Sequence, residues 1–145
     1  MVQQPRYDHY ERSALFPDGQ AMQAPPDGTV DLGQPARKRA MAHPPAVTAA
    51  LVARGRERYD IFCSMCHGID GRGNGVVVSR GFPAPHSLLA ADQTGLSDRQ
   101  IFDAISRGYG IMYGHADRIP PRDRWAITAW VRVLQDAQQG APDGA

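Results

Sequence analysis

Two cysteines and a histidine stand close together near the middle of the sequence, at Cys63, Cys66 and His67. The chain has no other cysteine, and the C-x-x-C-H spacing is the attachment signature of a c-type haem. On a helix this spacing sets the thiols about one turn apart, so both can add to vinyl groups of one porphyrin. The adjacent imidazole can then take an axial position on the iron. The sequence therefore predicts one covalently bound haem c, with His67 as an iron ligand.

Two other kinds of site use the same cysteine spacing. A thioredoxin-like dithiol lies in a βαβ pattern, and no strand alternation surrounds Cys63 and Cys66. A structural zinc site needs four ligands, and the remaining histidines are scattered without a matching spacing. Both alternatives are weaker than haem attachment.

A haem iron bound by one histidine can take a second ligand on its other face, and Met112 is the predicted second ligand. It lies in a glycine-rich stretch, residues 108–114, whose backbone can fold closely over a porphyrin. A thioether favours Fe(II) and raises the reduction potential. His115, which would give a bis-histidine site, is the next candidate, and His86 is also possible. Three other methionines are poorly placed, either inside the attachment motif or in the N-terminal segment: Met65, Met22 and Met41.

The second ring nitrogen of His67 should donate to a backbone carbonyl, because such a contact orients a ligand histidine. The loop after the motif contains Pro83 and Pro85, and a proline would stiffen the segment that presents the carbonyl. The sequence does not decide which of the two prolines supports His67, and we take Pro85 as the candidate.

Three helices should position these residues. The first runs from an N-cap at Thr48 into Cys63, and Gly55 within it indicates close approach by another helix. The second spans about 97–107 with a capping box and ends at Gly108. The third starts after Pro120-Pro121 and carries an apolar face to about residue 135: Trp125, Trp130, Val131 and Leu134. The predicted fold class is all-α.

The loop of residues 68–85 contains the run Gly71-Arg72-Gly73-Asn74-Gly75. This run lacks the G-K-[ST] ending and the preceding strand of a phosphate-binding loop. We interpret it as flexible backbone that turns around the edge of the cofactor.

Composition divides the chain into three parts: an extended N-terminal segment at 1–46, a cytochrome-sized domain at 47–136 and a flexible tail at 137–145. The first part holds seven of the twelve prolines and spaced apolar residues such as Tyr7, Tyr10 and Phe16. Such a segment cannot bury enough surface to fold alone, and its pattern favours binding along a partner.

The net charge of +1 gives no reason to expect nucleic-acid binding. No run of about 20 apolar residues predicts a membrane-spanning helix. The N-terminus does not read as a signal peptide. Because covalent haem attachment takes place outside the cytoplasmic membrane, we expect a leader to precede this numbering or the start to be misplaced.

The region from Arg54 to Leu134 resembles a class I c-type cytochrome domain in its C-x-x-C-H-G motif, its Gly-x-x-x-Met loop and its closing Trp helix. More of the chain is similar to the monohaem cytochrome subunit of bacterial alternative complex III. The residues that carry this likeness form three N-terminal blocks and two later ones: Gln4–Asp8, Ser13–Gly19, Gly28–Val30, Arg80–Pro85 and Met112–Ile127.

This resemblance implies an electron-transfer subunit, not an enzyme by itself, in a quinol-oxidising membrane complex at the periplasmic face. It would take electrons from a multihaem subunit and pass them to a terminal oxidase or a soluble carrier. Members of the family often carry a lipidated N-terminal cysteine, which this sequence does not contain; membrane association would then come from partners or from residues that precede this numbering. The alternatives are an autonomous soluble cytochrome carrier, a haem enzyme or sensor with an open iron position, and a dithiol oxidoreductase.

Overall fold

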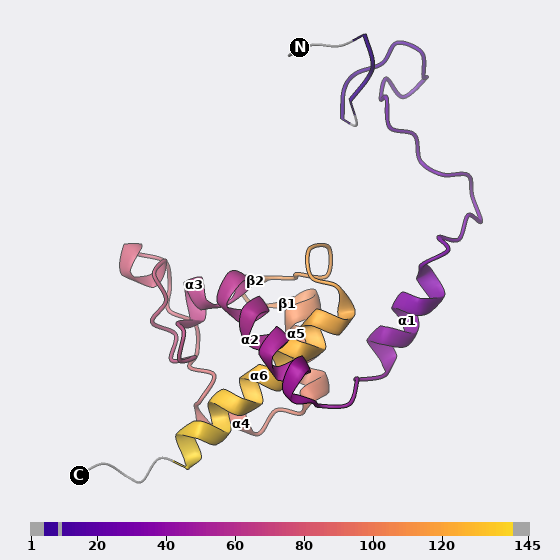
Figure 1. The fold of residues 1–145 in the computed structure, drawn as a ribbon. Helices are drawn as coiled ribbons and strands as arrows, with labels where there is room; N and C mark the ends of the chain where they lie inside the picture. The colour runs from indigo at the N-terminus through magenta and orange to yellow at the C-terminus, as the bar shows by residue number, and fades with distance from the viewer. Residues whose placement is uncertain (1–4, 9, 141–145) are drawn as a thin grey trace. The chain divides into compact units, whose positions relative to one another are not determined.

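The structure, a computed structural model, describes residues 5–8 and 10–140 of the chain. It consists of two units, Met1–Gln34 and Pro35–Ala145, whose positions relative to one another are not determined. The helices and strands are labelled in Figure 1, and their bounds are α1 Gln34–Ala42, α2 Ala49–Phe62, α3 Ser64–His67, η1 Val78–Arg80, α4 Ala91–Thr94, α5 Asp98–Arg107, β1 Gly108–Tyr109, β2 Met112–Tyr113 and α6 Pro121–Gln139.

In the described part of the first unit, the backbone closes a turn on itself. Arg12 and Gln20 form an isolated antiparallel bridge, and the Ser13 amide donates to the Gly19 carbonyl over 3.0 Å. Gly19 closes this turn with a φ of 70°, a value that favours glycine. The apolar side chains stay exposed, with Tyr10 at 94% and Leu32 at 99%. The partner-binding role of this segment stays a prediction, and residues 1–4 lie outside the described residues.

The second unit is built around the crossing of α2 and α6, which lie against each other in Figure 1. The crossing is close at Gly55, where an added Cβ would lie 2.0 Å from the carbonyl oxygen of Ala126 and 3.1 Å from the Cβ of Trp130. The close approach expected at Gly55 is therefore confirmed, with α6 as the neighbouring helix. Around the crossing, the core gathers buried side chains from α2, α5 and α6 together with the loop between the last two: Tyr59, Ile101, Ile105, Ile119, Ile127 and Val131.

The predicted starts of α2 and α5 are confirmed by their capping contacts, whereas α6 starts one residue earlier than predicted. The side chain of Thr48 accepts from the Leu51 amide at the start of α2. Ser97 and Gln100 form the expected capping box at the start of α5. Pro121 is the first residue of α6, where its missing N–H and fixed φ cost nothing.

Residues 34–42 form a helix, although the sequence predicted extended chain through residue 46. No residue of α1 is buried, so its sequence lacks the apolar periodicity by which a helix is recognised. Instead, side chains from the core hold its last turn. The indole Nε1 of Trp125 donates to the Ala40 carbonyl over 2.9 Å, and Arg99 donates to the Met41 carbonyl over 2.9 Å. The boundary between the two units accordingly falls near residue 34, not 46.

Two smaller differences concern the ends of elements. A two-stranded antiparallel hairpin, β1 with β2, follows α5 where no strand was expected. α6 continues to Gln139, past the predicted start of the tail at residue 137, and residues 141–145 lie outside the described residues. Within the described parts of the chain, no helix is both long and apolar enough to cross a bilayer.

Candidate haem-attachment site

The attachment motif occupies α3, a single helical turn that continues from α2 after a break at Cys63. Hydrogen bonds run from the amides of Cys66 and His67 to the Cys63 carbonyl, over 3.1 and 2.9 Å. The two cysteines thus lie one helical turn apart, as the spacing predicts. Neither is joined in a disulfide.

The glycine-rich loop after the motif caps the C-terminal end of α3. The carbonyls of Met65, Cys66 and His67 have no partner within so short a helix. The amides of Val77, Gly75 and Gly73, respectively, donate to them over 3.0, 3.1 and 2.8 Å. The loop thereby satisfies three successive carbonyls of the turn that carries the motif.

Glycine is needed at two of these positions because the backbones lie so close together. A Cβ on Gly75 would lie 2.2 Å from the Met65 carbonyl oxygen. A Cβ on Gly73 would lie 2.5 Å from the Pro85 carbonyl oxygen, at a backbone φ of 81°. These contacts explain why glycine is required at Gly73 and Gly75. They are consistent with the interpretation of this loop as backbone that turns around the edge of the cofactor.

Tyr59 connects the first helix to the end of the motif. Its side chain is fully buried, and its hydroxyl donates to the Gly68 carbonyl over 2.7 Å. Gly68 follows His67 directly and has a φ of 76°. This hydrogen bond fixes the chain where it leaves α3, and so helps to orient His67.

His67 is half-buried, and its ring Nδ1, which is buried, makes no hydrogen bond with a described residue. Burial lowers the pKa of His67, and repulsion from a protonated His115 lowers it further. A neutral imidazole is the form that coordinates a metal ion. His67 is therefore kept in the protonation state required of an axial ligand.

The surroundings of the Cys63 thiol differ from those of a reactive dithiol. Burial raises the pKa of Cys63 to about 12, with the charge of Cys66 as a smaller cause. Reactive dithiols have lowered pKa values in electropositive surroundings. The environment of Cys63 therefore argues against the dithiol oxidoreductase alternative.

Met112 is half-buried on β2, at the end of a tight hairpin. Tyr109 pairs with Met112, and the turn between them contains Gly110 with a φ of 58°. Met112 is covered, whereas three neighbouring apolar side chains project into solvent: Tyr109, Ile111 and Tyr113. A Cβ on Gly108 would lie 2.2 Å from the Met112 carbonyl oxygen, so this glycine permits the hairpin to close. Coordination by Met112 stays a prediction.

The other candidate residues lie in different environments. Pro85 is half-buried and Pro83 is exposed. The Pro85 carbonyl faces Gly73, the residue whose amide binds the His67 carbonyl, so Pro85 lies next to the motif; its contact with the His67 ring stays a prediction. The side chain of His86 is 83% exposed, beside Asp92, which makes it the weakest candidate for the iron.

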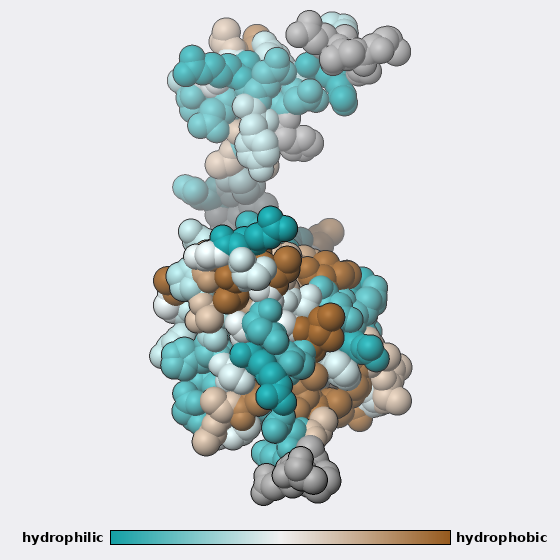
Figure 2. Space-filling view, turned by 90° about the vertical axis from the view of Figure 1, so that its left-hand side faces the viewer, coloured by the Kyte–Doolittle hydropathy of each residue, from teal (hydrophilic) through white to brown (hydrophobic). Residues whose placement is uncertain are grey.

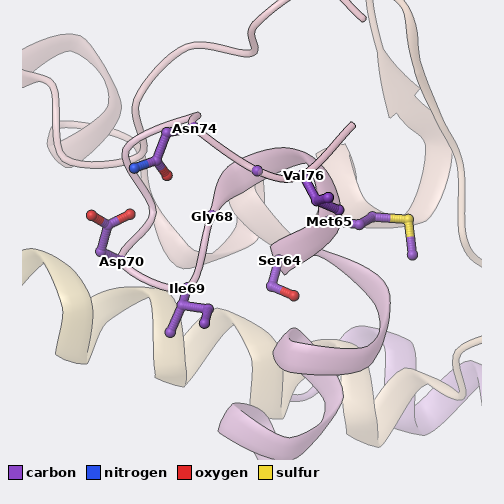
Figure 3. Close-up of a pocket in the computed structure, with 8 residues that line it drawn as sticks. Ser64, Met65, Gly68, Ile69, Asp70, Asn74 and Val76 are labelled. Atoms are coloured by element: carbon purple, nitrogen blue, oxygen red, sulfur yellow. The ribbon is translucent and has the colours of Figure 1, made fainter. Parts of the chain in front are cut away.

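A shallow hollow lies beside the motif, and Figure 3 shows its lining. Ser64, Gly68, Ile69, Asp70 and Asn74 contribute to it, and Met65 extends away from Asp70. The hollow includes neither cysteine nor His67, so it is separate from the predicted cofactor site.

The residues present fit a covalently bound haem. Two unpaired thiols lie one turn apart, a buried imidazole follows with an unpartnered nitrogen, and half-buried apolar side chains pack beside Cys63 against the core: Phe62, Leu88, Leu96 and Leu134. In residues 5–8 and 10–140, no three His, Cys, Asp or Glu side chains gather in a way that could hold a metal ion.

Comparison with known proteins agrees with this assignment. Residues 50–131 match the family model described as cytochrome c oxidase, cbb3-type, subunit III, which covers more than half of the chain. The chain belongs to this family and carries its c-type cytochrome domain, so the class I cytochrome c-like fold expected from the sequence is confirmed. A comparison with curated protein sequences gives no match.

Two solved structures are similar to the chain. One is the Kuenenia stuttgartiensis reducing HAO-like protein complex Kustc0457/Kustc0458, with 25% identity and a TM-score of 0.56 over 77% of this chain. This chain spans 51% of the length of that one. The other is the KustC0563 c-type cytochrome, with 27% identity and a TM-score of 0.43, over 57% of this chain and 94% of that one.

Sequence reasoning missed two structural roles at this site. It gave no hydrogen-bonding role to Tyr59, whose hydroxyl donates to the residue after the motif. It also gave no role to the amides of the glycine loop. A buried tyrosine hydroxyl needs a partner, and that rule was the signal available for the first of these roles.

Proposed function

We propose that this protein is the monohaem electron-transfer subunit of a quinol-oxidising membrane complex of the alternative complex III type. The observation that supports electron transfer best is the half-buried His67, whose pKa is lowered by burial, on a haem-attachment turn in a chain of a cytochrome c family. Electron transfer is the typical function of such a domain. In our proposal the subunit works at the periplasmic face of the membrane and is not an enzyme by itself.

The residues around the motif hold the cofactor and exclude water from it. One haem, attached through Cys63 and Cys66, would supply a one-electron Fe(III)/Fe(II) couple. His67 and Met112 are the residues that would ligate the iron. Buried apolar side chains keep the site at low dielectric, and a thioether ligand raises the potential.

Electrons would enter and leave near the two cysteines. Several apolar side chains close to them in sequence are exposed, from the end of α2 to the loop after α3: Ile61, Met65, Ile69, Val76 and Phe82. Hydrophobic residues are also visible over a broad part of the second unit in Figure 2. Small, transient docking areas are typical of redox partners. We propose that a multihaem subunit and a terminal oxidase or soluble carrier dock in turn near this edge.

Membership of an alternative complex III-type assembly is the more specific part of the proposal. It is supported by the N-terminal unit, whose apolar side chains stay exposed, and by the resemblance of its blocks to the alternative complex III subunit. Membrane association would then come from partner subunits. One of the similar solved chains also belongs to a multi-protein complex, as its printed name says.

Spectroscopy of the purified native protein tests the electron-transfer proposal. We expect a c-type spectrum, one haem for each chain after denaturation in alkaline pyridine, and the weak long-wavelength band of methionine ligation in the oxidised form. A protein without covalently bound haem would refute the proposal. In a Cys63→Ser/Cys66→Ser variant, haem should be lost from the denatured chain.

Co-purification tests the complex. Affinity-tagged full-length protein, taken from detergent-solubilised membranes of its own organism, should carry multihaem and membrane-integral subunits. A matched variant without residues 5–33 retains α1 and the whole second unit, and it should lose these partners. Recovery of the native chain alone, from the periplasmic fraction, would favour an autonomous soluble carrier.

A further inference from the structure

Three consecutive residues at the start of α6 each bind a different element of the second unit. Asp123 accepts from the guanidinium of Arg54 on α2 over 3.0 and 2.8 Å. Trp125 donates to a carbonyl of α1 over 2.9 Å. Arg124, between them, donates through Nη1 to the hydroxyl of Ser106 in the last turn of α5. The contact of Arg124 is the one that reaches toward the hairpin of β1 and β2.

Arg124 is buried far more deeply than most arginines, with only 2% of the residue exposed. Its guanidinium lies over the ring of Phe102, 4.8 Å from the centroid, and its buried Nε has no hydrogen bond with a described residue. Asp103, the next residue along α5, forms its ion pairs with Arg99 and Arg107, over 3.2 and 2.7 Å. Replacement of a buried charge by an apolar side chain of similar volume is often neutral for stability. The buried guanidinium of Arg124 therefore calls for an explanation other than stability.

The hydroxyl of Ser106 has both of its roles filled. It donates its single proton to the Phe102 carbonyl over 2.6 Å, so its oxygen is free to accept from Arg124. Ser106 lies one residue before the end of α5. The pair of Arg124 and Ser106 thus joins the first turn of α6 to the last turn of α5.

The hairpin that carries Met112 stands on this last turn of α5. The amides of Gly108 and His115, at its two ends, donate to carbonyls of the turn, the second over 2.9 Å. Between these contacts the returning chain passes directly over Ser106, because a Cβ on Gly114 would lie 2.7 Å from the Ser106 carbonyl oxygen. Met112 lies two residues before Gly114. A movement of the turn would therefore displace the strand on which Met112 lies.

We propose that Arg124 is a positioning residue for Met112: it fixes the turn of α5 on which the hairpin stands and so keeps the thioether at the haem iron. This inference rests on the proposed haem site and adds a residue that acts on it through Ser106 and the hairpin backbone. A planar guanidinium, held against a ring on one side and a hydroxyl at its end, suits the fixing of a single arrangement. A looser turn would let the thioether leave the iron more often.

Binding of added imidazole to the oxidised, full-length haem protein measures how often the sulfur leaves. Because imidazole competes with Met112, its apparent affinity rises with the fraction of iron that has lost the thioether. We expect Arg124→Met and Ser106→Ala to bind imidazole about tenfold more tightly, the effect of one lost hydrogen bond to a charged group. Both variants should also lose the long-wavelength methionine band well below the temperature at which circular dichroism reports unfolding. Ser106→Thr, which keeps the hydroxyl, should bind imidazole as the native protein does.

The matched control is Arg132→Met. Arg132 also lies on α6 and also binds α5, but through Asp98 at the start of that helix, over 2.7 Å, away from the hairpin. Its loss should lower the unfolding temperature and leave the imidazole affinity unchanged. An equal rise in imidazole affinity in the control would overturn the proposal, because general loosening of the fold would then explain the result.

Ser106→Ala and Ser106→Thr decide the question if Arg124→Met does not accumulate. Native-like imidazole binding by Ser106→Ala would overturn the positioning role of Arg124 and leave the covalent haem and the electron-transfer function intact. Absence of covalent haem in the native protein would instead refute the proposed function, and this inference with it.

Discussion

The crossing of α2 and α6 makes a sharp prediction for the variant Gly55→Ala. The new methyl group would lie 2.0 Å from the Ala126 carbonyl oxygen and 2.6 Å from its carbonyl carbon, so the two helix backbones must separate by more than an ångström. Overpacking of this kind costs about 1–3 kcal/mol, and the upper end applies because the obstacle is backbone. Replacing glycine within a helix returns about 1 kcal/mol. The expected net loss is about 2 kcal/mol in the free energy of unfolding.

Thermal unfolding of the haem-loaded protein measures this loss. In a domain of this size, about 2 kcal/mol corresponds to a decrease in Tm of roughly 8–16 °C. The matched control is Gly95→Ala, since a Cβ there would lie 3.7 Å from the nearest atom, the Ala91 carbonyl oxygen, which is an ordinary contact. The control should change stability by no more than about 0.5 kcal/mol. A Gly55→Ala protein as stable as the control would refute the argument that backbone contact sets the crossing.

Three further predictions concern contacts around the site. Gly75→Ala, whose Cβ would meet a carbonyl of the attachment turn at 2.2 Å, should reduce the yield of chain with covalent haem, measured by haem staining of denatured protein. Tyr59→Phe removes the shorter of two hydrogen bonds to the Gly68 carbonyl, which keeps the Gly71 amide at 3.3 Å, and should cost about 1 kcal/mol in denaturant unfolding; no change would mean that the remaining donor or water replaces the hydroxyl. Trp125→Phe removes the donor to the Ala40 carbonyl and should speed proteolysis within α1, with cleavage elsewhere in the chain as the internal reference.

The sequence predicts most of what is local in this domain. The N-cap at Thr48 and the capping box at Ser97 depend on neighbouring residues, and both are present as expected. Gly55 could be interpreted because a glycine inside a helix is costly unless another backbone approaches it. The attachment motif could be interpreted because its chemistry is contained in five consecutive residues.

The features that the sequence did not predict depend on distant contacts. α1 buries no side chain, and its last carbonyls bind Arg99 and Trp125, donors that lie far along the chain. No local pattern in residues 34–42 carries that information. The backbone of His115 is another example: its amide donates to the Ile105 carbonyl over 2.9 Å, a contact that only the folded chain creates.

The capping of α3 has a consequence for the order in which parts of this protein fold. The hydrogen bonds described here for the attachment turn and its glycine loop connect residues between 59 and 77, so closing them requires only short loops. The crossing at Gly55, by contrast, needs residues of the last helix. Contacts that are close in sequence form faster than distant ones. We therefore expect the turn that presents both thiols to be formed early, before α6 packs on α2 and encloses the core.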